Sequence, residues 1–451
     1  MRRALLLIFV GCGAATPSPL PRPRPSSIGP DAAAPVAIPP LDAGALPPPT
    51  PGCSLGAARA VSSAAGELGV LEAGLTIAAR GPAVGISWSR KQYPTEDYGD
   101  PYDGTIPHLG SWTGPRFEGL AIKEVGISSG AAQSQQTAAI VVVNPKAERV
   151  AFGAALFAEH GQRGFSVTAD FAGLPFAAPR FMPTGFAAST PGGGFVGASR
   201  EEGPLRAVIA ADGIHTPWPS FEECYQRLQE GKGHPACFSA GPPTETKLMA
   251  FPRAGKPRTH TIATPGASAI ALGATRGALV LRHEGALSVV SFDAAVEKVA
   301  APVALRKGDV GAPAIAFDGD AMWIAWAERA PPDARYRLFV ARWADEPAPP
   351  APTAIETGDA HAFAPALAVR EGKVFLAWTE GDLKDHGSIH AAAWPASAKP
   401  PSALRTAPLT TTDANARDPE LAAGDATWVA WTHYTKAAPR GDVMAAPLEC
   451  P

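Results

Sequence analysis

The C-terminal third of the chain repeats a pattern of short apolar segments, and this repeat constrains the fold more than any other feature. Each unit has an apolar segment that contains Pro, then a segment that ends in Trp, then a third apolar run. The three marker residues are Trp326, Trp378 and Trp431, so the period is 52 and then 53 residues. Gly, Pro and Asp separate the segments, which is typical of turns between short strands. Each unit is therefore expected to form a small antiparallel sheet.

A unit of about 50 residues with four short strands is typical of one blade of a β-propeller. A small sheet cannot bury both faces alone, whereas sheets stacked around an axis bury their faces against one another. Fourth-strand segments are expected at 352–357 and 402–409, and weaker copies of the second strand end at 88, 157, 198 and 282. We therefore predict an all-β fold, a β-propeller of seven four-stranded blades. Six or eight blades, or a β-sandwich, stay open as alternatives.

The last unit lacks a fourth strand on its C-terminal side. Residues 57–64 (AARAVSSA) precede the first blade and are apolar enough to supply that strand. Such an N-terminal strand closes the ring and removes an exposed sheet edge. We therefore expect the two ends of the folded region to lie side by side.

The chain has five cysteines, and four remain when the candidate lipid site Cys12 is set aside. An even number in an exported chain indicates two disulfides, for which three connectivities exist. We favour Cys53–Cys450, because the closing strand brings these residues together, and the local pair Cys224–Cys237. A metal site is the alternative, although no CxxC or CxxH pair occurs.

The N-terminal residues indicate export. Residues 1–12 combine Arg2 and Arg3 with a short apolar run that ends at Gly11-Cys12, which resembles a bacterial lipoprotein signal; an ordinary secretory signal is the alternative. Residues 13–52 form a Pro/Ala-rich linker that cannot bury a core. We therefore expect a propeller domain over 53–451, lipid-anchored in the bacterial cell envelope, at the outer membrane, with no transmembrane span.

A polar residue follows two positions after each second-strand marker. In a propeller these positions begin connections on one face, where they could bind a cation, a sugar or a peptide. The structural alternative is that each residue caps a strand or pairs with the neighbouring blade. The candidate binding residues are Arg90, Glu159, Arg200, Glu284, Glu328, Glu380 and His433.

Two insertions extend these connections. Residues 89–115 concentrate aromatic side chains, which are common at recognition surfaces; the candidate binding residues are Tyr93, Tyr98, Tyr102 and Trp112. The same insertion holds Asp97, Asp100 and Asp103, a weak Ca²⁺ candidate and the only cofactor expected. The second insertion, 212–247, is predicted to contain a short helix from about 220 to 231, pinned by Cys224–Cys237.

The repeat over about 72–450 resembles bacterial sialidase-like and WD-repeat-like propellers. The resemblance concerns the blade pattern only, because the S-x-D-x-G-x-x-W turns of sialidase-like propellers are absent and Arg116-Phe117 poorly matches their Arg-Ile-Pro signature. It therefore implies a fold and extracytoplasmic binding, but not glycosidase chemistry.

Charge and motifs narrow the function classes. A net charge of −3 gives no footprint for nucleic acid. No P-loop occurs, and Gly192-Gly193-Gly194 precedes an expected strand rather than a helix, so it indicates a turn and not a phosphate site. We therefore expect a binding or scaffold module whose partner is an envelope protein or a glycan, rather than an enzyme. The alternative is a sialidase-like glycoside hydrolase, which requires two carboxylates on the propeller face.

Overall fold

The computed structural model divides the chain into residues 1–46 and residues 47–451. Described within the second unit are residues 52–62, 70–92, 104–124, 138–144, 149–156, 165–170, 180–181, 195–199, 203–213, 226, 229–230, 244–252, 254–256, 258–329, 335–344, 349–383, 386–411, 415–434 and 441–451. None of these residues belongs to a helix that is long and apolar enough to cross a membrane. The signal, Cys12 and most of the linker lie outside the described residues.

The described strands form seven antiparallel sheets, numbered here in chain order. Sheet 1 consists of β3 (Val70–Arg80), β4 (Ala83–Gln92), β5 (Gly104–Thr113) and β6 (Glu118–Glu124), and sheet 2 of β7 (Ala138–Asn144), β8 (Arg149–Leu156), β9 (Phe165–Asp170) and β10 (Arg180–Phe181). Sheet 3 consists of β11 (Phe195–Ser199), β12 (Leu205–Gly213), β13 (Glu245–Pro252) and β14 (Arg258–Ile262), and sheet 4 of β15 (Ala267–Leu272), β16 (Arg276–His283), β17 (Ala286–Asp293) and β18 (Val303–Lys307). Sheet 5 consists of β19 (Asp309–Val310), β20 (Ala314–Asp318), β21 (Ala321–Arg329), β22 (Arg337–Trp343) and β23 (Thr353–Ile355), and sheet 6 of β24 (His361–Arg370), β25 (Lys373–Gly381) and β26 (Gly387–Pro395). Sheet 7 consists of β27 (Asn415–Ala423), β28 (Thr427–Tyr434) and β29 (Gly441–Glu449), and the N-terminal strands β1 (Ser54–Leu55) and β2 (Arg59–Ala60) pair with β29.

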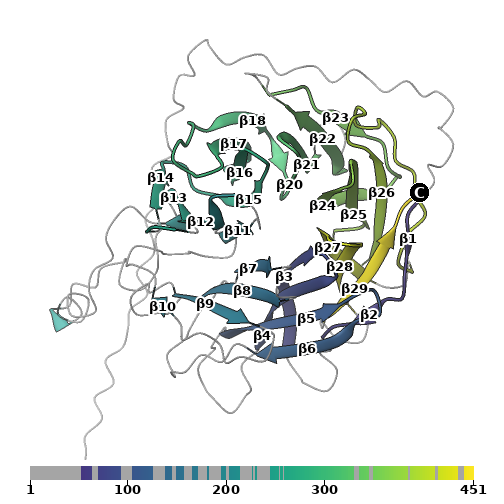
Figure 1. The fold of residues 1–451 in the computed structure, drawn as a ribbon. Coiled ribbons are helices and arrows are strands. Elements are labelled where there is room, and N and C mark those ends of the chain that lie inside the picture. Colours follow the sequence, from purple (N-terminus) through teal and green to yellow (C-terminus); the bar gives the residue numbers. More distant parts are fainter. Residues whose placement is uncertain are drawn as a thin grey trace, which may run out of the picture. The chain divides into compact units, whose positions relative to one another are not determined.

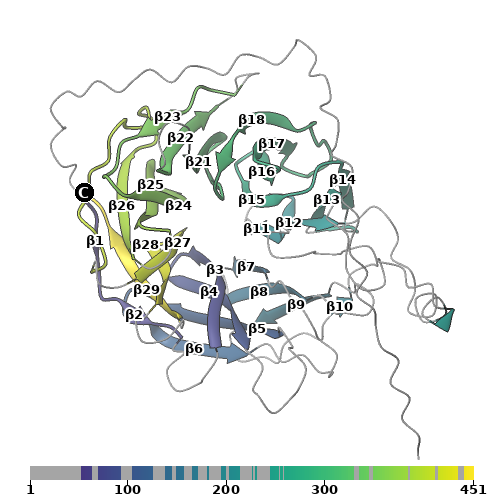
Figure 2. The ribbon, with the colours of Figure 1, turned by 180° about the vertical axis from the view of Figure 1, so that it is seen from behind.

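Successive sheets are in contact through their first strands. β3 contacts β7, β7 contacts β11, and the contacts continue through β15, β20, β24 and β27, which in turn contacts β3. Figure 1 and Figure 2 show these strands inside and the later strands of each sheet outside. The all-β, propeller-like fold predicted from the repeat is confirmed.

The apolar core lies between sheets rather than within them. One cluster joins Trp323 and Val340 of sheet 5 to Trp378 and Leu376 of sheet 6. Other clusters join sheets 3 and 4, sheets 4 and 5, sheets 6 and 7, and sheets 7 and 1. Each sheet thus depends on its neighbours for burial, as expected for stacked repeats.

The N-terminal segment pairs with the last strand of the chain. Ser54 and Leu55 pair with Glu449 and Leu448 of β29, and Arg59–Ala60 continue along the same strand. The position of this segment agrees with the predicted closing strand, although pairing begins earlier, at Ser54. Cys53 and Cys450 form the predicted disulfide.

The repeated proline of the sequence pattern lies at a β-bulge in the first strand. In β24 the register shifts between Phe363 and Ala366, around Pro365. In β27 the register shifts between Arg417 and Glu420, around Pro419. Proline has no N–H to donate to the ladder, so a bulge on an inner edge strand accommodates it.

The two ends of the sheets differ in their connections. First and second strands are joined by tight turns, such as Asp318–Ala321 and Arg370–Lys373. Second and third strands are joined by connections of very different length, and the longest, from Gly213 to Glu245, holds an insertion. The turns between first and second strands lie at the same end of neighbouring sheets. Between sheets 7 and 1, the Asp425 N–H donates to the Gly81 carbonyl, and between sheets 4 and 5, the Ala274 N–H donates to the Gly319 carbonyl. We call the end that carries the second-to-third connections the long-loop face.

One predicted fourth strand is wrong. Residues 353–355 form β23 as expected, but residues 402–409 do not pair as a strand with β26. Instead, the Leu404 N–H donates to the carbonyl of Glu356 at 2.7 Å, and Ala403 forms a parallel bridge with Glu356. Leu404 is 2% exposed in the cluster between sheets 5 and 6, so burial against the neighbouring sheet explains the departure.

We predict that Cys53→Ser and Cys450→Ser each lower the melting temperature, and that the double variant is no worse than either single variant. The disulfide joins residues 397 apart, so the chain-entropy model assigns it about 6 kcal/mol of unfolding free energy. Thermal unfolding under non-reducing conditions measures the effect. Equal melting temperatures for wild type and double variant would contradict it.

Candidate functional site

The strand register places four of the predicted polar residues at equivalent positions. Each follows by two residues a Trp of the second strand, and each lies at the end of that strand nearest the long-loop face. The four are Arg90, Glu328, Glu380 and His433. The spacing of the repeat was therefore a sound guide to their backbone positions.

Two other members of the predicted set do not occupy that position. Phe195–Ser199 is the first strand of sheet 3 rather than the second, so Arg200 follows a first strand. Glu284 lies in the β16–β17 turn with φ 47° and a side chain 84% exposed. The register instead aligns His283 with Glu328. Degenerate early repeats caused both misalignments; Arg200 itself and Glu159 lie outside the described residues.

Glu328 is held by a neighbouring sheet. Its carboxylate accepts hydrogen bonds from Arg306 Nε and Nη2, both at 2.7 Å, although only 3% of its side chain is exposed. Trp326 Nε1 donates to the same carboxylate at 3.3 Å. The hydrogen bond to Glu328 raises the pKa of Arg306. The pair joins sheets 4 and 5, so the structural alternative for this position holds.

Glu380 occupies the same position without an equivalent arginine. Arg306 lies two residues before Gly308-Asp309. The residue two before the matching pair Gly358-Asp359 is Glu356, which therefore takes the place of Arg306. Glu380 accepts a hydrogen bond from Trp378 Nε1 at 3.4 Å, and no arginine among the described residues lies within 4 Å of it. Burial raises the pKa of Glu380, and the charges of Arg405 and Arg335 oppose that rise. Gly358 lies directly beside it, and a Cβ at that position would overlap the carboxylate unless the Glu380 side chain moved.

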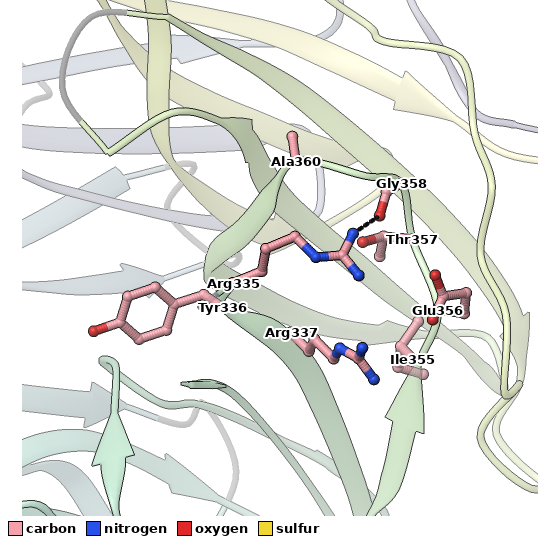
Figure 3. Close-up of a pocket in the computed structure, with 8 residues that line it drawn as sticks. All are labelled: Arg335, Tyr336, Arg337, Ile355, Glu356, Thr357, Gly358 and Ala360. Carbon is pink, nitrogen blue, oxygen red and sulfur yellow. Dashed lines mark hydrogen bonds between the residues drawn. The ribbon is translucent and has the colours of Figure 1, made fainter. Parts of the chain in front are cut away.

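A shallow notch opens at the start of β22 on the long-loop face (Figure 3). One residue that lines it, Gly358, lies against the Glu380 carboxylate. Arg335, Arg337 and Glu356 contribute charged side chains to its wall, together with Thr357 and Tyr336. Arg335 Nη1 donates to the Gly358 carbonyl at 3.0 Å, which ties the start of β22 to the connection that leads into β24. The notch is thus formed by sheet 5 and by the connection that leads from it into β24.

A buried polar chain lies behind Glu380. His390 stacks on Trp378 with ring centroids 5.6 Å apart. Its Nδ1 lies 3.1 Å from the Thr406 carbonyl, which can only accept, so Nδ1 carries the proton. His390 Nε2 then accepts from Ser388 Oγ at 3.1 Å. Burial lowers the pKa of His390 to about 4, so the ring is neutral at pH 7.

Two carboxylates occupy the bulge of β27, and the sequence reading missed them. Asp418 has φ 52°, and its N–H donates to Thr379 Oγ1 at 3.1 Å. Desolvation by the surrounding sheets raises the pKa of Asp418, and desolvation together with the Asp418 charge raises the pKa of Glu420 to about 8, although the surface of Asp418 is exposed and that of Glu420 is half-buried. Burial also raises the pKa of Tyr434 to about 12.

A sequence signal for this pair existed. The bulge of sheet 6 reads Ala364-Pro365-Ala366, whereas the bulge of sheet 7 reads Asp418-Pro419-Glu420. Carboxylates at positions that hold alanine in the neighbouring repeat have no part in the repeated packing. The repeat did not predict them, because a repeated pattern describes what the units share and not where one unit departs from it.

Trp112 does not belong to an exposed loop. It lies in β5, is 2% exposed, and packs edge-on against Trp428 with ring centroids 5.3 Å apart. The strands extend further into the insertion than expected, to Gln92 and from Gly104. Tyr93, Tyr98 and Tyr102 lie outside the described residues, as do Asp97, Asp100 and Asp103.

The second insertion is mostly outside the described residues, including Cys224 and Cys237. Within it, the Glu230 N–H donates to the Gln226 carbonyl at 3.0 Å, a helical hydrogen bond inside the predicted helix. At its base, Asp212 Oδ1 accepts from the backbone of Gly266 and Ala267 at 2.8 and 2.9 Å. In the described part of the chain, no three His, Cys, Asp or Glu side chains are grouped to hold a metal ion.

Comparison with known proteins concerns the fold alone. No family model and no curated protein matches the sequence. A protein of unknown function from Dyadobacter fermentans aligns with 89% of this chain and 100% of its own, at 11% identity and a TM-score of 0.50. The β-propeller domain of the Trilobed protease from Pyrococcus furiosus aligns with 84% of this chain and 93% of its own, at 9% identity and a TM-score of 0.45. Trypanosoma rangeli sialidase aligns with 88% of this chain and 58% of its own, at 9% identity and a TM-score of 0.39.

We predict that Glu328→Gln destabilises the fold more than Glu380→Gln. The first change leaves Arg306 without its carboxylate in a largely buried site, which costs about 3 kcal/mol. The second change removes a carboxylate that forms no ion pair with a described arginine. Chemical denaturation at pH 7 compares the two free energies of unfolding. A larger loss for Glu380→Gln would contradict the assigned difference.

The pKa values of Glu420 and His390 predict opposite effects of pH on stability. Folding raises the pKa of Glu420 from 4.5 to about 8, so its contribution is lost as pH rises through that window. Folding lowers the pKa of His390 from 6.5 to about 4, so its contribution is lost as pH falls from 6.5 to 4. The melting temperature should therefore fall from pH 6.5 to 8.

Glu420→Gln should abolish the alkaline fall, and His390→Asn should reduce the loss at acid pH. Glu371→Gln changes an exposed carboxylate, 76% accessible in a tight turn, and serves as the control. Melting temperatures from pH 4 to 9 give the profiles. Parallel curves for wild type and Glu420→Gln would show that Glu420 is not the responsible group.

Proposed function

We propose that the seven sheets are the blades of one closed propeller. The unbroken series of contacts from β3 through β27 and back to β3 supports this. The pairing of β1 and β2 with β29 gives the last sheet its outer strands. A closed ring leaves no blade face uncovered, which is the physical advantage of this architecture.

We propose that this propeller is a binding or scaffold module for an envelope protein or a glycan, and that the ligand contacts the long-loop face. The observation that carries the proposal is that the two predicted insertions, around residues 93–103 and 214–244, both connect a second strand to a third strand. The notch at the start of β22 lies at the same end of the sheets as the ends of the second strands that carry Glu328 and Glu380. Function in repeat folds is commonly concentrated on the face with variable connections.

The same proposal includes an anchor. A lipid on Cys12 and the Pro/Ala-rich linker would hold the module at the outer membrane of a bacterial cell envelope. The support is the signal-like sequence of residues 1–12 alone. Mass spectrometry of the mature N-terminal peptide tests it, and an unmodified peptide that begins after Cys12 would exclude it.

One observation favours a glycoside hydrolase as the second candidate. A carboxyl group whose pKa lies near 8 stays protonated at neutral pH, as a general acid requires. Glu420 meets that condition, and Asp418 lies two residues away in the same bulge. Hydrolysis of a panel of 4-nitrophenyl glycosides tests this candidate. Wild-type activity that Glu420→Gln abolishes would support it, and an inactive wild type would exclude these substrates.

We predict that replacing residues 93–103 with a short Gly-Ser turn leaves the melting temperature unchanged and weakens ligand binding at least tenfold. The strands β4 and β5 stay paired up to Gln92 and Gly104, so the replacement removes only the connection. Binding is measured on an array of defined oligosaccharides and with purified envelope proteins.

The matched control is Glu371→Gln, at the opposite end of the sheets, which should bind as wild type does. If every ligand of the wild type binds the loop variant with equal affinity, the insertion is not part of the binding surface.

A further inference from the structure

The closing segment is held to the domain by two short ladders and by side-chain contacts. The Val443 N–H donates to Ser62 Oγ at 3.2 Å, Leu55 packs against the cluster between sheets 6 and 7, and Arg59 lies over the Phe117 ring. β1 and β2 have two residues each and are separated by Gly56–Ala58. Between and after them, the Gly56 N–H donates to the Pro447 carbonyl at 2.9 Å and the Val61 N–H to the Val443 carbonyl at 2.8 Å. Val61, which is 2% exposed, is the one large side chain of the segment that is fully buried.

The disulfide lies at the end of this segment where tension would enter. Cys53 directly precedes β1, and the segment runs antiparallel to β29. A pull on Gly52 therefore acts first on the pair Ser54↔Glu449 and would then separate the pairs one at a time toward Ala60↔Met444. Sequential separation of strand pairs needs little force, because only one pair resists at any moment.

The strand at the other end of the disulfide is held much more firmly. β29 pairs with β28 over eight consecutive residues, from Thr427↔Leu448 to Tyr434↔Gly441. β28 is in turn paired with β27, and Trp428 and Trp431 of β28 are buried in two different clusters between sheets. Tension that enters at Cys450 therefore acts on a longer ladder, and separating that ladder would also disturb the packing of Trp428 and Trp431.

We propose that Cys53–Cys450 is a tension clamp that transfers a pull on the N-terminal segment directly to β29, so that β1 and β2 carry none of it. The proposal gives the disulfide a mechanical role beyond its effect on the unfolding free energy. It is relevant to the cell only if the chain is anchored through its N-terminal segment, as the proposed function states.

The test is force spectroscopy on the full chain. One handle is attached at the N-terminus, and the other through a peptide tag inserted in the β16–β17 turn at Glu284, whose side chain is 84% exposed. Three proteins are compared: wild type, the Cys53→Ser/Cys450→Ser double variant, and a Cys224→Ser/Cys237→Ser control. No ligand is present, so a negative result concerns the clamp and leaves the binding proposal to its own test.

Wild type and control should show no step before the main unfolding event. The clamp variant should show an earlier step at lower force that releases residues 53–62. At about 3.5 Å per residue, this is roughly 35 Å of contour length. The same early step in wild type, or its absence from a folded clamp variant, would overturn the proposal.

Two further measurements keep the test decisive. Without force, the Val61 and Ser62 amides should exchange faster in the clamp variant than in wild type; equal rates would show that pairing alone holds the segment. If the clamp variant does not fold, folded wild type is reduced by a phosphine during pulling. The disulfide then gains two electrons and two protons to give two thiols, and the phosphine takes oxygen from water to become its oxide.

Discussion

The structure depends on burial of each sheet against the next. Second-strand tryptophans such as Trp323 and Trp378 have no exposed surface, yet they lie at sheet surfaces. They are buried only because a neighbouring sheet covers them. A single sheet would leave these rings in water, at a cost of about 25 cal/mol for each Å² of apolar area. The sheets are therefore stable as a set, and the pairing of β1 and β2 with β29 adds strands to the last of them.

The buried and half-buried carboxylates differ in whether a partner from the neighbouring sheet accompanies them. Glu328, with its bidentate Arg306, joins two sheets and is structural. Glu380 occupies the same position but lacks that partner, and Asp418 and Glu420 replace alanines of the neighbouring bulge. Glu380 has a raised pKa because it is largely buried without a compensating arginine. Glu420 has a raised pKa although it is only half-buried, and the charge of Asp418 beside it contributes to the rise. Such departures are where a repeat fold most readily acquires a function.

The sequence predicted the candidate site only in part. Positions two residues after a strong Trp marker were placed correctly, because strand register follows the hydrophobic pattern. Arg200 and Glu284 were misplaced where that pattern is weak. Trp112 was assigned to a loop because the insertion is rich in aromatic residues, whereas packing against Trp428 draws it into β5. Local composition could not distinguish a ring that binds a ligand from one that fills the core.

The sequence by itself determined the all-β, repeated architecture and the disulfide partners Cys53 and Cys450, because the alternation of apolar segments and turns encodes local strands and their order. Only the tertiary structure decided which sheet each segment joins. Residues 402–404 pair with the preceding sheet, and Asp418 and Glu420 share one bulge with raised pKa values. These outcomes depend on burial and charge contributed by residues far away in the chain. A periodic pattern defines a unit, whereas the environment of a side chain is defined by the units packed around it.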